Sequence, residues 1–276
     1  MSQLVLHTEE DKIAILTLNK PNSFNALDME ITEEFLEKLD SCIASSTIRA
    51  IIITGAGKAF CAGGDLLKVC EAAVPPSEIL GQMVRYLNLA IMDIKRSDKP
   101  IIAAINGVAA GAGLSLALAC DLRVASSKAK FRQAYTSAGL TPDGGWTVFA
   151  PAQLGLGRAM ELVLLDQAID AETALSWGAI NKICPEDQVM NTALEWAKHI
   201  TSGPAYAFAQ AKKLLNRTAL PNLESFLEDE RYSMIAASAS EDGLEGINAF
   251  VEKRRPVFCK NNNGHQHPNR QTPFES

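Results

Sequence analysis

The stretch Pro100-Ile-Ile-Ala-Ala-Ile-Asn-Gly-Val-Ala-Ala-Gly-Ala-Gly113 decides the fold of this 276-residue chain. Its first six residues are apolar without a break, which is typical of a strand buried on both faces of a parallel sheet. The glycines that follow favour a turn, and the apolar residues up to Cys120 favour a buried helix. Because Asn106 and three glycines interrupt the run, it predicts a strand, a turn and a helix rather than a membrane span.

Other segments extend this pattern to the rest of the chain. Strands of the same kind are predicted at residues 50–54 and 122–125, and the apolar runs at 4–6 and 13–18 flank an acidic turn, as in a β-hairpin. Asp28 is a candidate N-cap for an amphipathic helix that continues to Ile43. Strands that alternate with helices predict an α/β fold with a mainly parallel sheet. From about residue 155 only helices are predicted, at 158–165, 171–177, 189–200, 205–216, 223–237 and 241–253.

Composition and charge restrict the class of protein. Hydrophobic residues make up 47% of the chain and charged residues 21%, which favours a globular protein with a large core and excludes fibrous and disordered classes. The net charge of −6 leaves no bulk basic surface, so we expect neither nucleic acid nor a membrane as a partner. The six cysteines lack metal-ligand spacing, which predicts no metal site. An early acidic turn predicts no secretion signal, so a cytoplasmic location is expected.

Two glycine-rich segments follow predicted strands, at residues 59–65 (AFCAGGD) and 106–113 (NGVAAGAG). Small residues let a ligand approach the backbone, and N–H groups at a helix start point outward with a partial positive charge. A pair of such segments is able to direct two donors at one oxygen. Neither segment has the spacing of a dinucleotide-binding motif or a phosphate loop. Tight packing of a helix on a strand explains either segment alone but explains the pair less well.

The chain resembles the crotonase (enoyl-CoA hydratase/isomerase) superfamily in several segments, in order from about residue 3 to residue 258. These include residues 22–27 (NSFNAL), 58–66 (KAFCAGGDL), 99–113 (KPIIAAINGVAAGAG), 120–125 (CDLRVA) and 139–145. The resemblance implies an α/β fold, a crotonase-like spiral of ββα units with a C-terminal helical trimerisation region. We therefore expect a spiral core over residues 1–200, a helical oligomerisation region over 201–258 that neighbouring subunits help to cover, and a disordered tail over 259–276. The expected assembly is a homotrimer or a hexamer of two trimers.

The resemblance also implies an acyl-CoA thioester as the ligand, with CoA as part of the substrate and no separate cofactor. The thioester oxygen would accept hydrogen bonds from the backbone N–H groups of Gly64 and Ala112, an oxyanion hole. CoA would contact Ala62, Asp65 and Leu66, which resemble the adenine-binding stretch of the family. Candidates for the CoA phosphates are the nearby basic residues Lys58, Lys68, Lys253, Arg254 and Arg255.

Departures from the family pattern narrow the expected reaction. Hydratases of the family carry two glutamates that orient a water, and this chain has Ser115 and Tyr135 at those positions. Neither hydroxyl replaces a carboxylate as a base at neutral pH, so hydration of a double bond is not expected. Ser115 is interpreted as a small packing or ligand-contact residue. The expected walls of the acyl pocket are Met83, Leu87, Tyr135, Leu140 and Trp146.

Asp143 is the candidate acid and base. It lies in the sequence Leu-Thr-Pro-Asp-Gly-Gly at residues 140–145, which resembles single-aspartate enoyl-CoA isomerases of the phenylacetate-pathway type. A lone carboxylate is able to move a proton from C2 to C4 of a 3-enoyl thioester, giving the 2-enoyl isomer without a water. Burial beside apolar residues such as Leu140 and Trp146 would raise the pKa of Asp143 toward neutrality.

Three alternatives stay open at this point. Pro-Asp-Gly-Gly is also an ordinary turn sequence, which gives Asp143 a purely structural interpretation. A dehalogenase or hydrolase would use Asp143 as a nucleophile, but the histidine of those relatives would fall near Met92, and no histidine lies between His7 and His199. A protein that binds acyl-CoA without catalysis is the third alternative.

Overall fold

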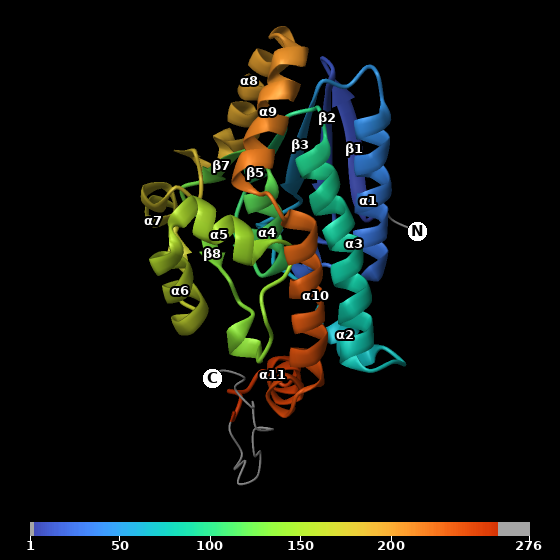
Figure 1. The fold of residues 1–276 in the computed structure, drawn as a ribbon, viewed down its shortest axis with the longest axis vertical. Helices are drawn as coiled ribbons and strands as arrows, with labels where there is room; N and C mark the ends of the chain where they lie inside the picture. The colour runs from blue at the N-terminus through green and yellow to red at the C-terminus, as the bar shows by residue number, and fades with distance from the viewer. Residues whose placement is uncertain (1–2, 259–276) are drawn as a thin grey trace, which may run out of the picture.

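The computed structural model describes residues 3–258, whose strands form two sheets (Figure 1). In the larger sheet β1 and β2 pair antiparallel, which confirms the predicted hairpin, and the other neighbours pair parallel. Its order is β1 (Val5–Glu10), β2 (Ile13–Leu18), β3 (Ala50–Gly55), β5 (Ile101–Ile105), β7 (Leu122–Ser126) and β10 (Lys182–Cys184). The smaller sheet has the order β4 (Ala59–Cys61), β6 (Val108–Ala110), β8 (Lys130–Arg132) and β9 (Ile169–Asp170).

The larger sheet is buried on both faces. On one face, Ile51 and Ile53 of β3 belong to the core cluster that includes α1 (Met29–Ala44) and α3 (Pro76–Arg96). On the other face, Ile52 packs in a second cluster with residues of α8 (Val189–Ser202). An unbroken β-branched run is therefore what this strand requires. The helix α1 begins as predicted after Asp28, whose carboxylate accepts a hydrogen bond of 3.0 Å from the Ile31 N–H.

The remaining helices surround the two sheets. They are α2 (Leu66–Glu71), α4 (Ala112–Ala119), α5 (Trp146–Leu154), α6 (Leu156–Leu165), α7 (Ala171–Trp177), α9 (Ala205–Ala219), α10 (Leu223–Ala239) and α11 (Glu241–Val251), with 3-10 turns η1 (Pro21–Ser23), η2 (Thr136–Ala138) and η3 (Glu186–Gln188). The helices predicted beyond residue 155 are confirmed as α6 to α11, with ends that differ by a few residues. The prediction of helices alone was wrong, because β9 and β10 also lie there, and strands of two and three residues are too short to give a pattern. None of the helices within residues 3–258 is both long and apolar enough to cross a bilayer.

Both glycine-rich segments contain a short strand, which corrects their prediction as simple turns. The strands β4 and β6 pair in parallel, with Ala59 opposite Val108. Each strand has three residues, too short a pattern to distinguish from a turn rich in small residues. Because carboxyl ends of parallel strands meet at one edge of a sheet, the loops that follow β4 and β6 emerge side by side.

The C-terminal helices fold back on the same chain. The helix α10 lies against α3, and α11 lies at the end of the molecule near α2 and η2 (Figure 1). A Cβ atom at Gly246 of α11 would stand 2.1 Å from the carbonyl oxygen of Ala138, so α11 and η2 are in backbone contact. The oligomerisation role expected for residues 201–258 stays a prediction. The tail expected at 259–276 lies outside the described residues.

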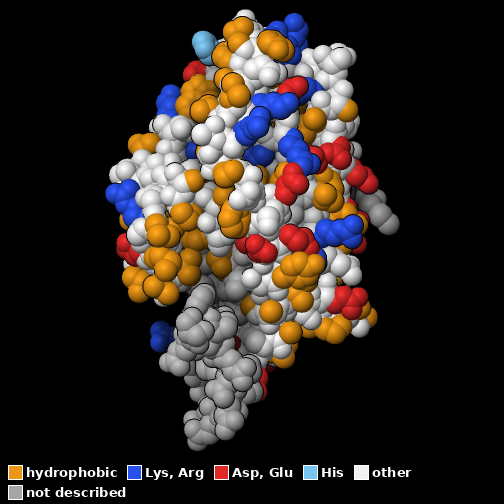
Figure 2. Space-filling view, viewed as in Figure 1, with side chains coloured by type: hydrophobic (Ala, Val, Ile, Leu, Met, Phe, Trp, Pro, Cys, Tyr) orange, Lys and Arg blue, Asp and Glu red, His pale blue; other side chains and the backbone are white. Residues whose placement is uncertain are grey.

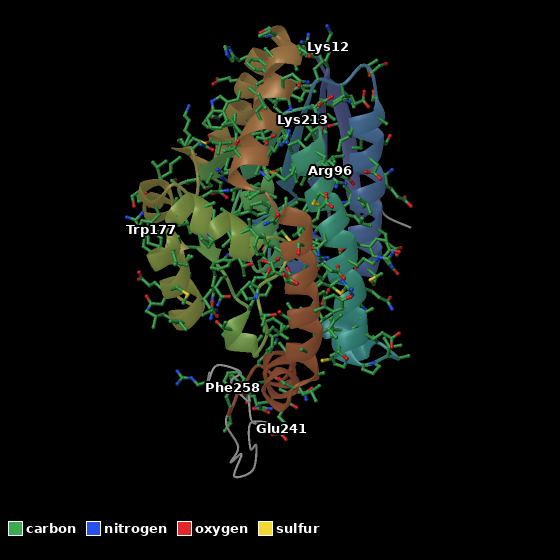
Figure 3. The ribbon with its side chains drawn as sticks, in the orientation of Figure 1. Lys12, Arg96, Trp177, Lys213, Glu241 and Phe258 are labelled. Carbon is green, nitrogen blue, oxygen red and sulfur yellow. The ribbon has the colours of Figure 1, made fainter. Side chains whose placement is uncertain are left out.

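Basic and apolar side chains form separate groups on the face of the molecule shown in Figures 1 and 2. Lys and Arg side chains gather over α9 and the neighbouring end of α3 (Figure 2), and they include Arg96 and Lys213 (Figure 3). Apolar side chains gather on α6, where Leu156, Met160 and Leu164 recur every four residues and are each more than half exposed. This spacing puts the three apolar residues on one face of the helix.

The contact between α11 and η2 predicts that Gly246→Ala destabilises the protein by ~1–3 kcal/mol, because the added methyl group has no space beside Ala138. Gly157→Ala is the matched control, since a Cβ atom there meets no atom within 4 Å and alanine favours the helix α6. Urea unfolding of both variants checks the difference. Equal stability of the two variants would contradict the close contact.

Candidate functional site

The loops after β4 and β6 carry two backbone N–H groups without an acceptor. Gly63 and Gly111 have φ values of +97° and +50°, and a Cβ atom at Gly63 would lie 2.9 Å from the carbonyl oxygen of Ala110. The two loops therefore pack backbone to backbone. The next residues are Gly64 and Ala112, and among the hydrogen bonds of residues 3–258 neither of their N–H groups is a donor. Ala112 is also the first residue of α4, where N–H groups have no partner within the helix.

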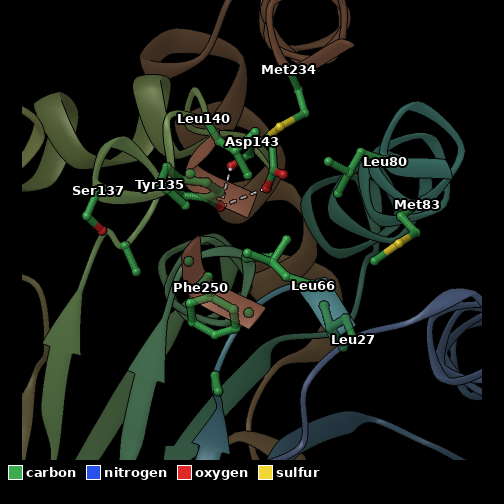
Figure 4. A pocket seen from close by; sticks show the side chains of 18 of the residues that line it. Leu27, Leu66, Leu80, Met83, Tyr135, Ser137, Leu140, Asp143, Met234 and Phe250 are labelled. Carbon is green, nitrogen blue, oxygen red and sulfur yellow. Dashed lines mark hydrogen bonds between the residues drawn. The ribbon is translucent and has the colours of Figure 1, made fainter. Parts of the chain in front are cut away.

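Gly64 and Ala112 line a cavity of about 210 Å³ (Figure 4). Its apolar wall comes from the segment before α1, from α2 and α3, from the loop after η2 and from α10, and it includes Leu27, Leu66, Leu80, Met83, Val84, Leu87, Leu140 and Met234. Of the pocket walls predicted from the sequence, Met83, Leu87, Tyr135 and Leu140 line the cavity. Trp146 does not line the cavity, because its side chain is 1% exposed and belongs to the hydrophobic core. Such a cavity suits an apolar group placed next to two N–H donors.

Asp143 enters this cavity with a hydrogen-bonded network behind it. The residue is 5% exposed, and its Oδ1 lies 2.7 Å from the Tyr135 hydroxyl oxygen (Figure 4). Ser115 donates a hydrogen bond of 2.8 Å to the main-chain carbonyl of Asp143. The hydroxyl oxygens of Ser115 and Tyr135 lie 3.0 Å apart. Ser115 and Tyr135, which the resemblance places at the positions of the hydratase glutamates, thus both contact Asp143, and no sequence pattern predicted this network.

The protons of this network are compatible with either state of Asp143. Two hydroxyl groups supply two protons for the three oxygen–oxygen contacts of 3.0 Å or less, and two longer contacts, to the carbonyls of Gly111 and Asp143, measure 3.4 and 3.5 Å. All three contacts become hydrogen bonds when the Asp143 carboxyl donates to Tyr135, Tyr135 donates to Ser115, and Ser115 donates to the Asp143 carbonyl. When the carboxyl is ionised, Tyr135 donates to it instead, and the contact between the two hydroxyls has no proton. The carboxyl is therefore able to exist in either state without moving.

Burial raises the pKa of Asp143 to about 7. The hydrogen bond from Tyr135 opposes this rise because it stabilises the ionised form, and the negative charge of Glu230 adds to it. Burial also raises the pKa of the Tyr135 phenol well above its usual value, so Tyr135 stays protonated near neutral pH. The sequence-based expectation that burial would raise the pKa of Asp143 is thus confirmed in its direction.

Glycine at positions 144 and 145 is required to place Asp143. Their φ values are +61° and +81°, in the region that favours glycine. A Cβ atom at Gly144 would lie 2.9 Å from Leu87 and 3.0 Å from Ser115, and one at Gly145 would lie 2.4 Å from the Phe149 ring. The turn is therefore pressed against α3, α4 and α5, which fixes the direction of the Asp143 side chain.

Glu230 is a buried acid near the site that the sequence analysis missed. It lies on α10, is 5% exposed, and accepts hydrogen bonds from the N–H groups of Gly145 and Thr147 at 2.7 and 2.8 Å. The Thr147 hydroxyl donates a third. The available sequence signal was an acidic residue on the stripe of buried positions of α10, which also includes Leu223, Leu227, Met234 and Ser238.

The residues expected to bind CoA lie in different environments. Ala62 and Leu66 line the cavity. Asp65 does not, because its carboxylate caps α2 and pairs with Lys20 at 3.3 Å. The predicted basic residues that do not line the cavity are all exposed, namely Lys58, Lys68, Lys253 and Arg255. Arg254 lines the cavity, and its guanidinium group pairs with Glu245 and Glu252. The CoA-binding roles of these residues stay predictions.

Comparison with known proteins identifies the family. The family model described as enoyl-CoA hydratase/isomerase matches residues 8–261. The chain belongs to the enoyl-CoA hydratase/isomerase family. As a member of this family the chain is an enzyme, and its spiral of two sheets and packed helices is the crotonase fold. Residues 3–258 hold no cluster of three or more His, Cys, Asp and Glu side chains suited to a metal ion.

Individual members of the enoyl-CoA hydratase/isomerase family differ in their reactions. A 1,2-epoxyphenylacetyl-CoA isomerase of Escherichia coli (strain K12) is 36% identical over 94% of this chain and 99% of the relative. A short-chain-enoyl-CoA hydratase of Clostridium acetobutylicum is 34% identical over 93% of this chain and 98% of the relative. The crystal structure of an enoyl-CoA hydratase from Mycobacterium avium subsp. paratuberculosis K-10 has a TM-score of 0.84 at 30% identity, over 93% of this chain and 98% of that one. Family membership therefore does not identify the reaction of this chain, which has to be inferred from the residues of the site.

The raised pKa of Asp143 predicts a pH-dependent loss of stability that Asp143→Asn removes. The carboxyl ionises near its ordinary value of 3.8 in the unfolded chain but only near pH 7 in the folded one, so the wild type loses stability between these values as the pH rises. Asparagine does not titrate. The stability of the variant relative to the wild type should therefore increase by ~2–4 kcal/mol between about pH 4 and about pH 8.

Denaturant unfolding at the two pH values measures this change. Asp98→Asn, at an exposed aspartate, is the control and should show no such trend. A stability difference between Asp143→Asn and the wild type that is the same at both pH values would argue against a buried carboxyl with a raised pKa.

Proposed function

We propose that the chain is an acyl-CoA isomerase that moves a double bond from the 3,4 to the 2,3 position of an enoyl-CoA thioester. The observation that carries the proposal is the position of Asp143, the one acidic residue of the described chain that lines the cavity, together with the unpaired N–H groups of Gly64 and Ala112. The pKa of Asp143 is about 7, and a group takes and returns a proton most efficiently when its pKa is close to the pH at which the enzyme works.

The reaction divides into two proton transfers by the same carboxyl. The Asp143 carboxylate first takes the proton from C2, so that the C2–H bond breaks, an O–H bond forms, and the electron pair delocalises as a dienolate onto the thioester oxygen. The N–H groups of Gly64 and Ala112 stabilise that oxygen, and one donor of this kind contributes ~10²–10³ in rate. The protonated Asp143 then donates to C4, which leaves the double bond between C2 and C3 and restores the carboxylate.

Ser115 and Tyr135 support isomerisation rather than hydration. In the ionised state of the site, Tyr135 donates to Oδ1 of Asp143 at 2.7 Å, and no donor of the described residues reaches Oδ2. Oδ2 is then the oxygen available for the C2 proton. Addition of water needs a second group to activate the water, and the two positions that hold glutamates in hydratases hold hydroxyls here.

The acyl group is proposed to be apolar, because aliphatic and aromatic side chains form most of the cavity wall. Ring-derived thioesters are a second candidate substrate class, favoured by the similarity to the 1,2-epoxyphenylacetyl-CoA isomerase. CoA is proposed to lie along Ala62 and Leu66 as part of the substrate, with no separate cofactor. Use of Asp143 as a nucleophile is less supported, since no histidine of the described residues lines the cavity.

Asp143→Asn is expected to lower the turnover of a 3-enoyl-CoA by ~10²–10⁴, because the base is lost while the cavity keeps its shape. The affinity for CoA esters should stay near that of the wild type. Absorbance of the conjugated product and exchange of the C2 proton with D₂O measure the reaction, with 3-enoyl, 2-enoyl and ring-derived CoA esters as the substrate panel.

Each other outcome of this experiment identifies a different function. Equal turnover in Asp143→Asn would remove Asp143 from the mechanism. A product that has gained water would support a hydratase, and loss of a ring substituent would support a dehalogenase. Binding of CoA esters without turnover or proton exchange across the panel would identify a binding protein.

We also propose that the chain assembles as a homotrimer or as a hexamer of two trimers. The support is the apolar face of α6, where Leu156, Met160 and Leu164 are exposed in a single chain. Sedimentation equilibrium should give the mass of three or six chains, and Leu164→Asp should lower that mass, since it puts a charge into an apolar contact. The mass of a single chain for the wild type would contradict this proposal.

A further inference from the structure

Glu230 lies outside the cavity but is bonded to the turn that carries Asp143. We propose that Glu230 is a positioning residue, which fixes this turn and places a second negative charge near Asp143. The inference rests on the proposed function only in taking Asp143 as the base. It assigns to α10, a helix of the expected oligomerisation region, a part in tuning the catalytic carboxyl.

The contacts of Glu230 define its positioning role. One carboxylate oxygen accepts from the Gly145 N–H at 2.7 Å, and the other accepts from the Thr147 N–H at 2.8 Å and from the Thr147 hydroxyl. These donors belong to the start of α5, where unpaired N–H groups carry a partial positive charge that favours an anion. Glu230 therefore acts as the N-terminal cap of a helix that lies in another part of the chain. Because Gly145 is two residues from Asp143, this cap also holds the turn.

The hydrogen-bond donors around the two carboxyls differ in number. Glu230 accepts three hydrogen bonds from the start of α5, whereas the side chain of Asp143 has one hydroxyl partner, Tyr135. Burial raises the pKa of Glu230, and its three hydrogen bonds oppose that rise because they stabilise the ionised form, which favours ionisation of Glu230 ahead of Asp143. Its charge then opposes the appearance of a second negative charge in the same buried region. This is the direction in which Glu230 acts on the pKa of Asp143.

The other groups around Asp143 provide no comparable charge. Tyr135, at the start of η2, donates to the carboxyl, and α4 and α3 present the uncharged Ser115 and Leu87 to the turn. The helix α5 has no ionisable residue. The basic residues of the cavity lining are each paired with carboxylates of their own, Arg132 with Asp166 and Arg254 with Glu245 and Glu252. Of the described charged groups, Glu230 is thus the one placed to raise the pH at which Asp143 ionises.

Glu230→Gln tests the inference because it removes the charge and keeps the size of the side chain, while its amide nitrogen leaves one of the two N–H groups without an acceptor. The pKa of Asp143 should fall by about 0.5–1 pH unit, since one like charge nearby is lost. The carboxyl C=O infrared band of the protein without substrate reports this titration, with Asp143→Asn to assign the band. Glu228→Gln is the matched control, since Glu228 is on the same helix but pairs with Arg231 at the surface, and it should leave the titration unchanged. Tyr135→Phe should move the pKa of Asp143 upward, because it removes a hydrogen bond to the ionised form.

Thr147→Val separates the charge of Glu230 from its role as a cap. This variant loses one donor to Glu230 but keeps the charge, so it should leave the titration of Asp143 within about 0.2 pH unit of the wild type. The acid limb of the pH–rate profile for isomerisation should shift downward in Glu230→Gln alone. An unchanged Asp143 titration in a Glu230→Gln variant that unfolds at the wild-type temperature would overturn the inference. Absence of isomerisation in the wild type would overturn the proposed function instead, because the infrared titration needs no substrate.

Discussion

The parallel hydrogen bonds between β4 and β6 place two loops at one edge of the smaller sheet, and the rest of the site is arranged around that edge. The donors are main-chain groups of Gly64 and Ala112, so the side chain at position 112 is free to be alanine. The strict requirement is instead for small residues where the backbones meet. A Cβ atom at Gly113 would lie 2.2 Å from the carbonyl oxygen of Cys61, which would separate α4 from β4. The positions of the two N–H groups thus depend on the close packing of α4 against β4.

In the same cavity as the two N–H groups, the site keeps a carboxyl in an environment that favours its neutral form. Apolar walls surround Asp143, and Glu230 adds a negative charge behind it. Tyr135 works in the other direction, since it stabilises the anion by a hydrogen bond. The balance of these effects gives the carboxyl a pKa of about 7, which suits the two proton transfers proposed for it. The same environment lowers the stability of the folded chain when the carboxyl is charged.

Much of this architecture could be predicted from local sequence. The apolar runs at 50–54 and 101–105 identify strands with two buried faces. Asp143 became a candidate through the resemblance of residues 140–145 to single-aspartate isomerases, since the turn sequence alone has a structural interpretation. Short strands such as β4 and β6 have no recognisable sequence pattern of their own. The 21-residue helix α3 was not predicted either, although it forms part of the cavity wall. Contacts between residues far apart in the sequence could not be predicted. Glu230 and Gly145, for example, form a hydrogen bond although they are 85 positions apart. The expectation that Trp146 lines the pocket was wrong, because a sequence does not give the direction in which a side chain points.

The close approach of Gly246 to Ala138 makes the last helices part of the same body as the turn that holds Asp143. A ribosome makes residues 1–200 first, including both N–H donors and the aspartate, yet Met234 of the cavity wall and the acceptor Glu230 come later. A chain that ends before α10 lacks one side of the cavity wall and the carboxylate that accepts from the first N–H groups of α5. The complete site therefore requires that the C-terminal helices have been synthesised and have packed against α3, which makes the site depend on completion of the chain.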